Sequence, residues 1–103
     1  MKIRFSNGMI RIRLVESDLQ DLREDKAVTL VTALSPVNSL HFSLIPSTNN
    51  AIQWKEDSNG HTLELPCALF KGNIEHETLL DHTFDHIHYP TRLVIEVDLP
   101  CMH

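Results

Sequence analysis

Four basic side chains stand at alternating positions near the start of the sequence: Lys2, Arg4, Arg11 and Arg13. Between them lies Asn7-Gly8, the dipeptide most typical of a two-residue β-hairpin turn. Such a turn pairs Lys2 with Arg13, and the same register pairs the two remaining arginines, so all four cations form one basic face. Because like charges placed opposite one another cost stability, we expect negatively charged groups nearby to offset this repulsion. An external anion could do so, either a phosphate-bearing ligand or an acidic protein.

The acidic residues that follow offer a second explanation of the basic face. They could cover it without any external partner, and they are Glu16, Asp18, Asp21, Glu24 and Asp25. The formal net charge of −5 also argues against a protein that coats nucleic acid, since such proteins carry a basic excess. The sequence leaves both explanations open.

A histidine-rich segment and the last residues could instead bind a metal ion. On a helix, His82 and His86 would share a face, whereas on a strand His86 and His88 would. Cys101 and His103 have the spacing of one strand face, and imidazole together with thiolate suits zinc. A small zinc-binding protein is therefore the alternative hypothesis. No complete four-ligand signature is present, so surface or partly buried histidines are the simpler explanation.

Sequence signatures of catalysis are absent. There is no P-loop, no Gly-x-Gly-x-x-Gly, no His-Glu-x-x-His and no Gly-x-Ser-x-Gly. Cys67 could lie in the first turn of a helix, where the dipole favours a thiolate, but no Cys–His signature surrounds it. We therefore expect a non-enzymatic binding module that uses the basic face, to which an exposed strand edge and a homodimer could contribute. An enzyme with a pocket inside a curled sheet is the weaker, third hypothesis.

The elements that must position these side chains follow from the apolar pattern. The predicted strands are the two arms of the first hairpin, residues 27–34, residues 39–46, a second hairpin around Asn59-Gly60, and residues 91–98. The second turn is expected to pair Lys55 with Glu64 and Trp54 with Leu65. In the last strand, Leu93, Ile95 and Val97 share a face. Residues 73–90 fit either a helix or a strand.

Two short helices are expected between these strands. Ser17 is predicted as an N-cap, with Gln20 completing a capping box, so the first helix covers about residues 17–25. Pro66 can open a second helix that runs through Phe70 and ends at Gly72.

These elements predict an α+β fold in a single domain, residues 1–103. Its sheet should be mainly antiparallel with about seven strands, because tight turns join most of them. The sheet could curl into a partial barrel, which would protect its edges. There are two cysteines outside any Cys-x-x-Cys pattern, no signal-like start and no apolar run of membrane-spanning length. These features predict a cytoplasmic protein that does not enter a membrane.

Both ends of the sequence carry a resemblance. Three motifs carry it: Met-Lys-Ile-Arg at residues 1–4, Asn-Gly-Met-Ile-Arg-Ile-Arg-Leu at residues 7–14, and an Asp followed shortly by Cys-Met-His at the end. They are similar to a family of short uncharacterised bacterial proteins. The resemblance implies a related fold, and it carries over no catalytic residue because that family has no activity that could be transferred. The histidine-rich segment departs from the family pattern.

Overall fold

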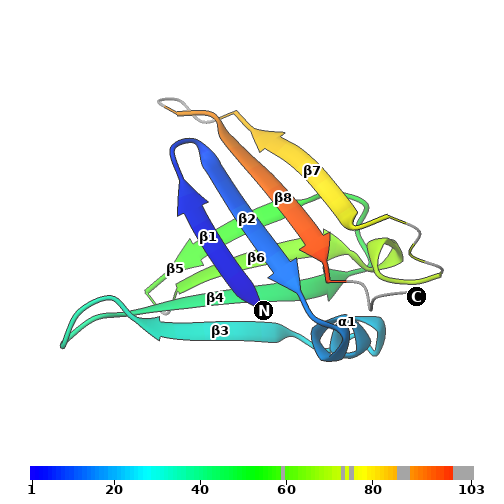
Figure 1. Cartoon of the computed structure of the whole chain (residues 1–103), viewed down its shortest axis with the longest axis horizontal. Coiled ribbons are helices and arrows are strands. Elements are labelled where there is room, and N and C mark those ends of the chain that lie inside the picture. The colour runs from blue at the N-terminus through cyan, green and yellow to red at the C-terminus, as the bar shows by residue number, and fades with distance from the viewer. Residues whose placement is uncertain (59, 73, 75, 86–88, 99–103) are drawn as a thin grey trace.

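The computed structural model describes residues 1–58, 60–72, 74, 76–85 and 89–98. Within them, eight strands form two four-stranded sheets, with one α-helix and one 3-10 turn (Figure 1). The strands are β1 (Lys2–Ser6), β2 (Met9–Leu14), β3 (Val28–Ala33), β4 (Ser39–Ser47), β5 (Gln53–Asp57), β6 (Gly60–Pro66), β7 (Thr78–Phe84) and β8 (Thr91–Val97). The helix is α1 (Glu16–Arg23), and the 3-10 turn is η1 (Cys67–Leu69).

The strand order corrects the predicted fold class. One sheet has the order β1-β2-β8-β7 and the other β3-β4-β6-β5, and the central pair of each sheet is parallel. The protein is mostly β, so the prediction of a mainly antiparallel α+β sheet with about seven strands and two helices is wrong. Tight turns explain only the antiparallel outer pairs, whereas the central pairs join strands distant in sequence. The described strands form two open sheets and no closed barrel.

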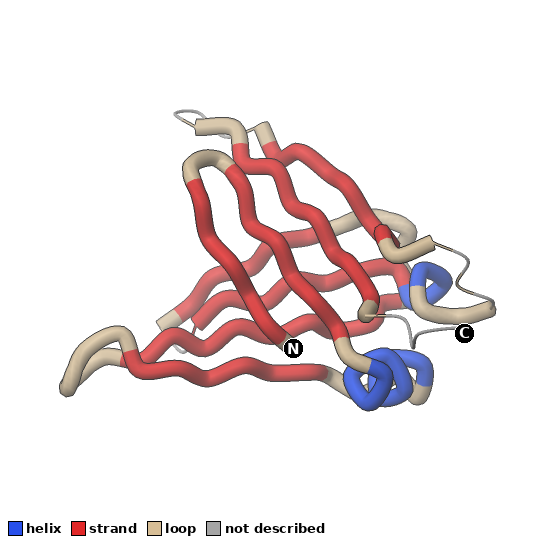
Figure 2. Tube along the Cα trace, viewed as in Figure 1, coloured by secondary structure: helices blue, strands red, loops and turns tan. Residues whose placement is uncertain are grey.

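The two sheets face each other, and their strands cross (Figure 2). Side chains alternate along each strand, so one face of each sheet points toward the core. In β8 the predicted face of Leu93, Ile95 and Val97 is confirmed, with at most 2% of each side chain exposed. Phe42 and Leu44 of β4 are equally buried in the facing sheet. The main core therefore lies between the two sheets.

The first hairpin has the predicted register. Lys2 lies opposite Arg13 and Arg4 opposite Arg11. Gly8 has a φ of +70°, a left-handed conformation that glycine adopts without the steric cost of a Cβ. The Asn-Gly rule and the alternating pattern therefore place all four cations on the outer face of β1 and β2.

The second hairpin turns one residue earlier than predicted. Gly60 already belongs to β6 and pairs with Asp57, so Trp54 lies opposite Leu63 rather than Leu65. Gly60 passes so close to β4 that a Cβ there would come within 2.7 Å of the His41 Cβ, which makes this position unsuitable for any larger residue. The shift leaves every side chain on its predicted face.

The predicted helices need two corrections. The helix α1 begins at Glu16 with Val15 as its N-cap, because the Asp18 carboxylate accepts a hydrogen bond from the Val15 N–H at 3.1 Å. Ser17 is therefore not the cap. The second helix, after Pro66, is only the 3-10 turn η1, and residues 78–84 form a strand. No helix in the described ranges is long and apolar enough to cross a membrane.

Candidate anion-binding site

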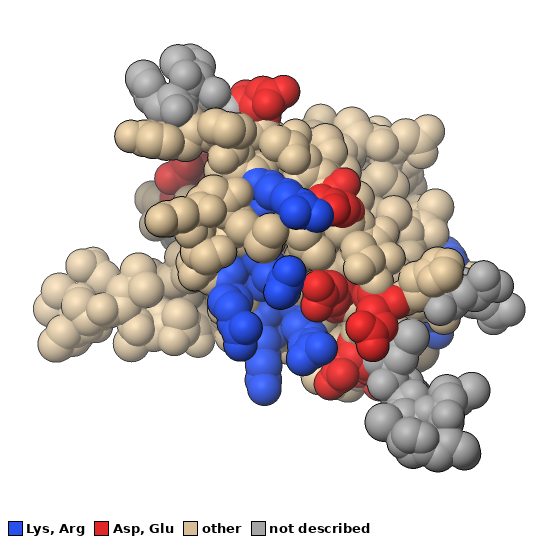
Figure 3. Space-filling model, turned by 45° about the horizontal axis from the view of Figure 1, so that its top comes forward, with Lys and Arg blue, Asp and Glu red and all other residues tan. Residues whose placement is uncertain are grey.

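The four cations of the basic face lie on the outer surface of the β1–β2 hairpin. Ile10 and Ile12, which alternate with the arginines of β2, are buried in the core, so the period of the strand turns Arg11 and Arg13 outward. Figure 3 shows lysine and arginine side chains gathered on this side of the molecule, with acidic side chains beside them. The face therefore results directly from strand alternation.

Most cations outside the basic face already have an acceptor. All nine lysines and arginines fall in the described part of the chain. Four of them pair with carboxylates away from the basic face, in the pairs Lys26–Glu24, Lys55–Glu64, Lys71–Asp25 and Arg92–Asp81. Arg23 donates to the backbone carbonyls of Phe70 and Gly72. Any lysine or arginine without an acceptor among the described residues therefore belongs to the basic face.

Three of the four cations of the basic face have no acidic partner among the described residues. Arg11 does have one, since its Nε lies 3.3 Å from Glu96 Oε1. No ion pair or hydrogen bond to a described residue involves the side chains of Lys2, Arg4 or Arg13. The cations that have no acidic partner in the described part of the chain therefore cluster in one place.

Three of the five acidic residues expected to cover this face contact groups other than its four cations. Asp18 contacts the amino group of Met1, at the margin of the hollow described below, at 2.7 Å, while Glu24 and Asp25 contact lysines outside the face. The carboxylate that contacts a cation of the face is that of Glu96 in β8, which the sequence did not single out. Its role depends on the parallel β2–β8 pairing, and no local sequence signal indicated that pairing.

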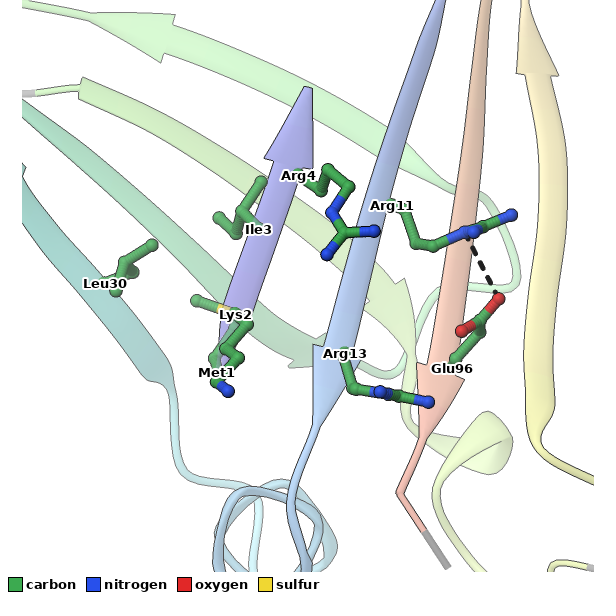
Figure 4. Close-up of a pocket in the computed structure, with 8 residues that line it drawn as sticks. All are labelled: Met1, Lys2, Ile3, Arg4, Arg11, Arg13, Leu30 and Glu96. Carbon is green, nitrogen blue, oxygen red and sulfur yellow. Dashed lines mark ion pairs between the residues drawn. The ribbon is translucent and has the colours of Figure 1, made fainter. Parts of the chain in front are cut away.

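A hollow of about 550 Å³ lies beside β1 (Figure 4). The side chains that line it are Met1, Lys2, Ile3, Arg4, Arg11, Arg13, Leu30 and Glu96. Ile3 and Leu30 come from facing sheets and supply an apolar part, and the cations supply a positively charged part. The hollow therefore combines apolar surface with unpartnered positive charge, a combination typical of binding sites.

A second arginine–carboxylate pair lies further across the same sheet. Arg92 Nε donates to Asp81 Oδ1 at 2.8 Å, and its Nη2 donates to the other carboxylate oxygen. These hydrogen bonds, together with the positive charge, hold the pKa of Asp81 below its ordinary value of 3.8 and raise the pKa of Arg92. Arg92 is therefore already engaged and adds no free cation to the site.

The structure places only one of the predicted zinc ligands. His82 lies in β7, partly buried, with its ring centroid 4.7 Å from that of Phe84 in an edge contact. His86, His88, Cys101 and His103 lie outside the described residues. In the described portion, no group of three or more His, Cys, Asp or Glu side chains could hold a metal ion. The zinc hypothesis therefore stays a prediction from the sequence.

Comparison with known proteins adds a family but no activity. The model of a family of unknown function, DUF7009, matches residues 1–103. No curated protein and no solved structure matches the chain. The expected resemblance to an uncharacterised family is confirmed to this extent, and the site has to be interpreted from its own residues.

Proposed function

Because the chain belongs to the DUF7009 family of unknown function, we propose a function from its surface alone: a non-enzymatic binding module whose basic face holds an anionic ligand. The observation that carries this proposal is the clustering of Lys2, Arg4 and Arg13, the cations without a described acidic partner, around one hollow. With Arg11 and Glu96 included, the described side chains that line the hollow carry four positive charges and one negative charge.

The energetics of the face support a ligand. Lys2 is paired across the strands with Arg13, and Arg4 with Arg11, so two like-charge pairs stand side by side. Each such pair destabilises a sheet, and Glu96 offsets only one of the four charges. An anion with two or more carboxylate or phosphate groups would neutralise the rest. Guanidinium groups suit this role because they donate paired, charge-assisted hydrogen bonds to such anions.

Protection of a sheet edge does not explain the whole pattern. Charged side chains on an edge strand discourage unwanted pairing, and this could account for Lys2 and Arg4 on β1. Arg13, however, lies on β2, which is paired on both sides, and its ladder neighbour on β8 is Glu96. A cation at that interior position does nothing for an edge. The described ion pair of Glu96 is with Arg11 rather than Arg13, so Arg13 remains available to a ligand.

The proposal can be tested with pyrophosphate and citrate as probes. In ¹⁵N–¹H NMR titrations at low ionic strength, both should shift amide signals of β1 and β2, and binding should weaken steeply as salt screens the charges. The double variant Arg4→Glu/Arg13→Glu should lose at least about tenfold in affinity. The matched control is Lys55→Glu/Lys71→Glu, which changes the net charge equally at residues paired elsewhere.

The control decides between a site and a general charge effect. If the two double variants lose affinity equally, the probes sense only the net charge of the protein and the proposed site is wrong. If neither probe shifts any β1 or β2 signal at low ionic strength, the proposal is likewise wrong.

A further inference from the structure

We propose that the anionic ligand of this site is an extended protein segment with alternating acidic and apolar residues, which binds by adding a strand to the free edge of β1. This inference rests on the proposed function, because it assigns a partner to the same basic face. It draws on three features of β1: its unpaired edge, its charges and its two-sided pattern.

The edge of β1 is available for pairing. β1 is the first strand in the order β1-β2-β8-β7, so it has a neighbour on one side only. Among the described residues, the backbone of Lys2–Ser6 pairs with β2 and makes no other backbone hydrogen bond. Edge strands expose rows of N–H and C=O groups that can pair with an added strand, and many peptide-binding domains use this mode.

The charges of β1 exclude a second copy of the same strand as the partner. An antiparallel β1–β1 contact would bring Lys2 and Arg4 of one chain against those of the other, and like charges in such positions repel. An acidic strand would instead place carboxylates beside Lys2 and Arg4. Arg13 lies next to Lys2 on the neighbouring strand β2 and adds a further positive charge. Charge complementarity therefore selects an acidic partner.

The two faces of β1 define the pattern of the partner. Lys2 and Arg4 point to the outer surface, whereas Ile3 is only partly buried and the Phe5 side chain is 56% exposed. Figure 4 shows Ile3 and Leu30 on the side of β1 away from β2, where an added strand would lie. Because side chains alternate along a strand, acidic residues would meet the cations while the residues between them cover this apolar surface.

The other edge strands lack this combination. β3 carries no charged residue, Lys55 of β5 is paired with Glu64, and Asp81 of β7 is paired with Arg92. Among the edge strands of the described fold, β1 is thus the one whose own cations lack a partner. The same observation that supports anion binding therefore also identifies the edge.

Three capped heptapeptides separate strand addition from simple charge attraction. The first alternates valine and glutamate, the second has the same composition with the glutamates in one block, and the third is the alternating peptide with N-methyl groups on consecutive backbone nitrogens, which block both edges of its strand. By calorimetry, the alternating peptide should bind at least about tenfold more tightly than either of the others, since only it can pair along a whole edge. Its binding should slow hydrogen exchange in β1 and not in β3, β5 or β7.

Each outcome bears on a different part of the proposal. If all three peptides bind equally and all are lost in Arg4→Glu/Arg13→Glu, the anion site stands and strand addition is overturned. Slowed exchange at β3, β5 or β7 instead of β1 also overturns it. If no peptide binds, and neither pyrophosphate nor citrate binds, the proposed function and this inference fail together.

Discussion

Arg4 lies directly opposite Arg11 in the β1–β2 pair, yet of the two only Arg11 has a carboxylate partner among the described residues, Glu96 Oε1 at 3.3 Å. Glu96 belongs to β8, which runs parallel to β2. Among the described residues that line the hollow beside β1, Glu96 is the only acid. Its carboxylate therefore controls how much of the positive charge is left for a ligand.

Removing this carboxylate should weaken the fold and strengthen binding. We expect Glu96→Gln to lower the free energy of unfolding by about 0.5–1 kcal/mol, the range of a partly exposed ion pair. The same change should tighten citrate binding by roughly threefold, because one negative charge leaves the site. Urea unfolding and calorimetry measure the two effects. Glu64→Gln, which breaks the Lys55 pair on the other sheet, should show only the loss of stability.

Removing one of the unpartnered cations should have the opposite effects. Arg13→Gln relieves the repulsion with Lys2 and should raise the free energy of unfolding by about 0.2–1 kcal/mol at low salt. The gain should disappear near 1 M salt, where charges are screened beyond about 3 Å. Citrate binding should weaken in the same variant. A gain of equal size in Lys71→Gln, whose cation is paired with Asp25, would contradict the explanation by local repulsion.

The sequence predicts best the features that depend on near neighbours. The register of the first hairpin follows from Asn7-Gly8 and from alternation over a few residues, and the inward face of β8 follows from alternation alone. The same local rules were less reliable where two of them competed. At α1 both Ser17 and Asp18 could cap the helix, and the carboxylate binds the Val15 N–H. At the second turn the register differs from the predicted one, and Gly60 lies close to His41 of β4, a distant contact that local rules do not include.

The sequence could not show which distant strands become neighbours. The parallel pairs β2–β8 and β4–β6 depend on burial shared between two sheets, and no local pattern records that. For this reason the four cations of the site were predictable, whereas Glu96 beside Arg11 and Leu30 near Ile3 were not. That three cations lack a partner among the described residues likewise became visible only in the structure, where Asp18, Glu24 and Asp25 contact other groups.

The pair of Asp81 with Arg92 should be visible in the titration of the carboxyl group. Arg92 lowers the pKa of Asp81 below its ordinary value of 3.8, so the pair stabilises the fold above the unfolded-state pKa. This contribution is lost as the pH falls through the lower, folded-state pKa. We expect Arg92→Gln to return the pKa toward 3.8 in ¹³C NMR titrations and to make unfolding less dependent on acidic pH. Lys71→Gln, at a separate ion pair, should leave the Asp81 titration unchanged.

Trp54 and Phe84 should be energetically coupled across the two sheets. Trp54 belongs to β5 and Phe84 to β7, and their ring centroids lie 5.7 Å apart in an edge contact. Trp54 Nε1 also donates to His61 Nδ1 at 3.2 Å. We expect Trp54→Ala to destabilise the fold by about 3 kcal/mol. A double-mutant cycle with Phe84→Ala should give a coupling of about 0.5–1.5 kcal/mol. If the two single-mutant losses of stability simply add in the double mutant, the contact between the rings does not stabilise the packing of the two sheets.

Gly60 and Gly72 should respond very differently to the same substitution. Both have positive φ, +143° and +85°, so alanine is strained at either position. At Gly72 a Cβ meets nothing within 4 Å, so Gly72→Ala should cost only the backbone strain, about 1–2 kcal/mol. At Gly60 the Cβ would meet the carbonyl oxygen and Cβ of His41, which forces β6 away from β4. Gly60→Ala should therefore cost at least about 1 kcal/mol more in urea unfolding, and equal costs would show that the close approach of β6 to β4 is not required.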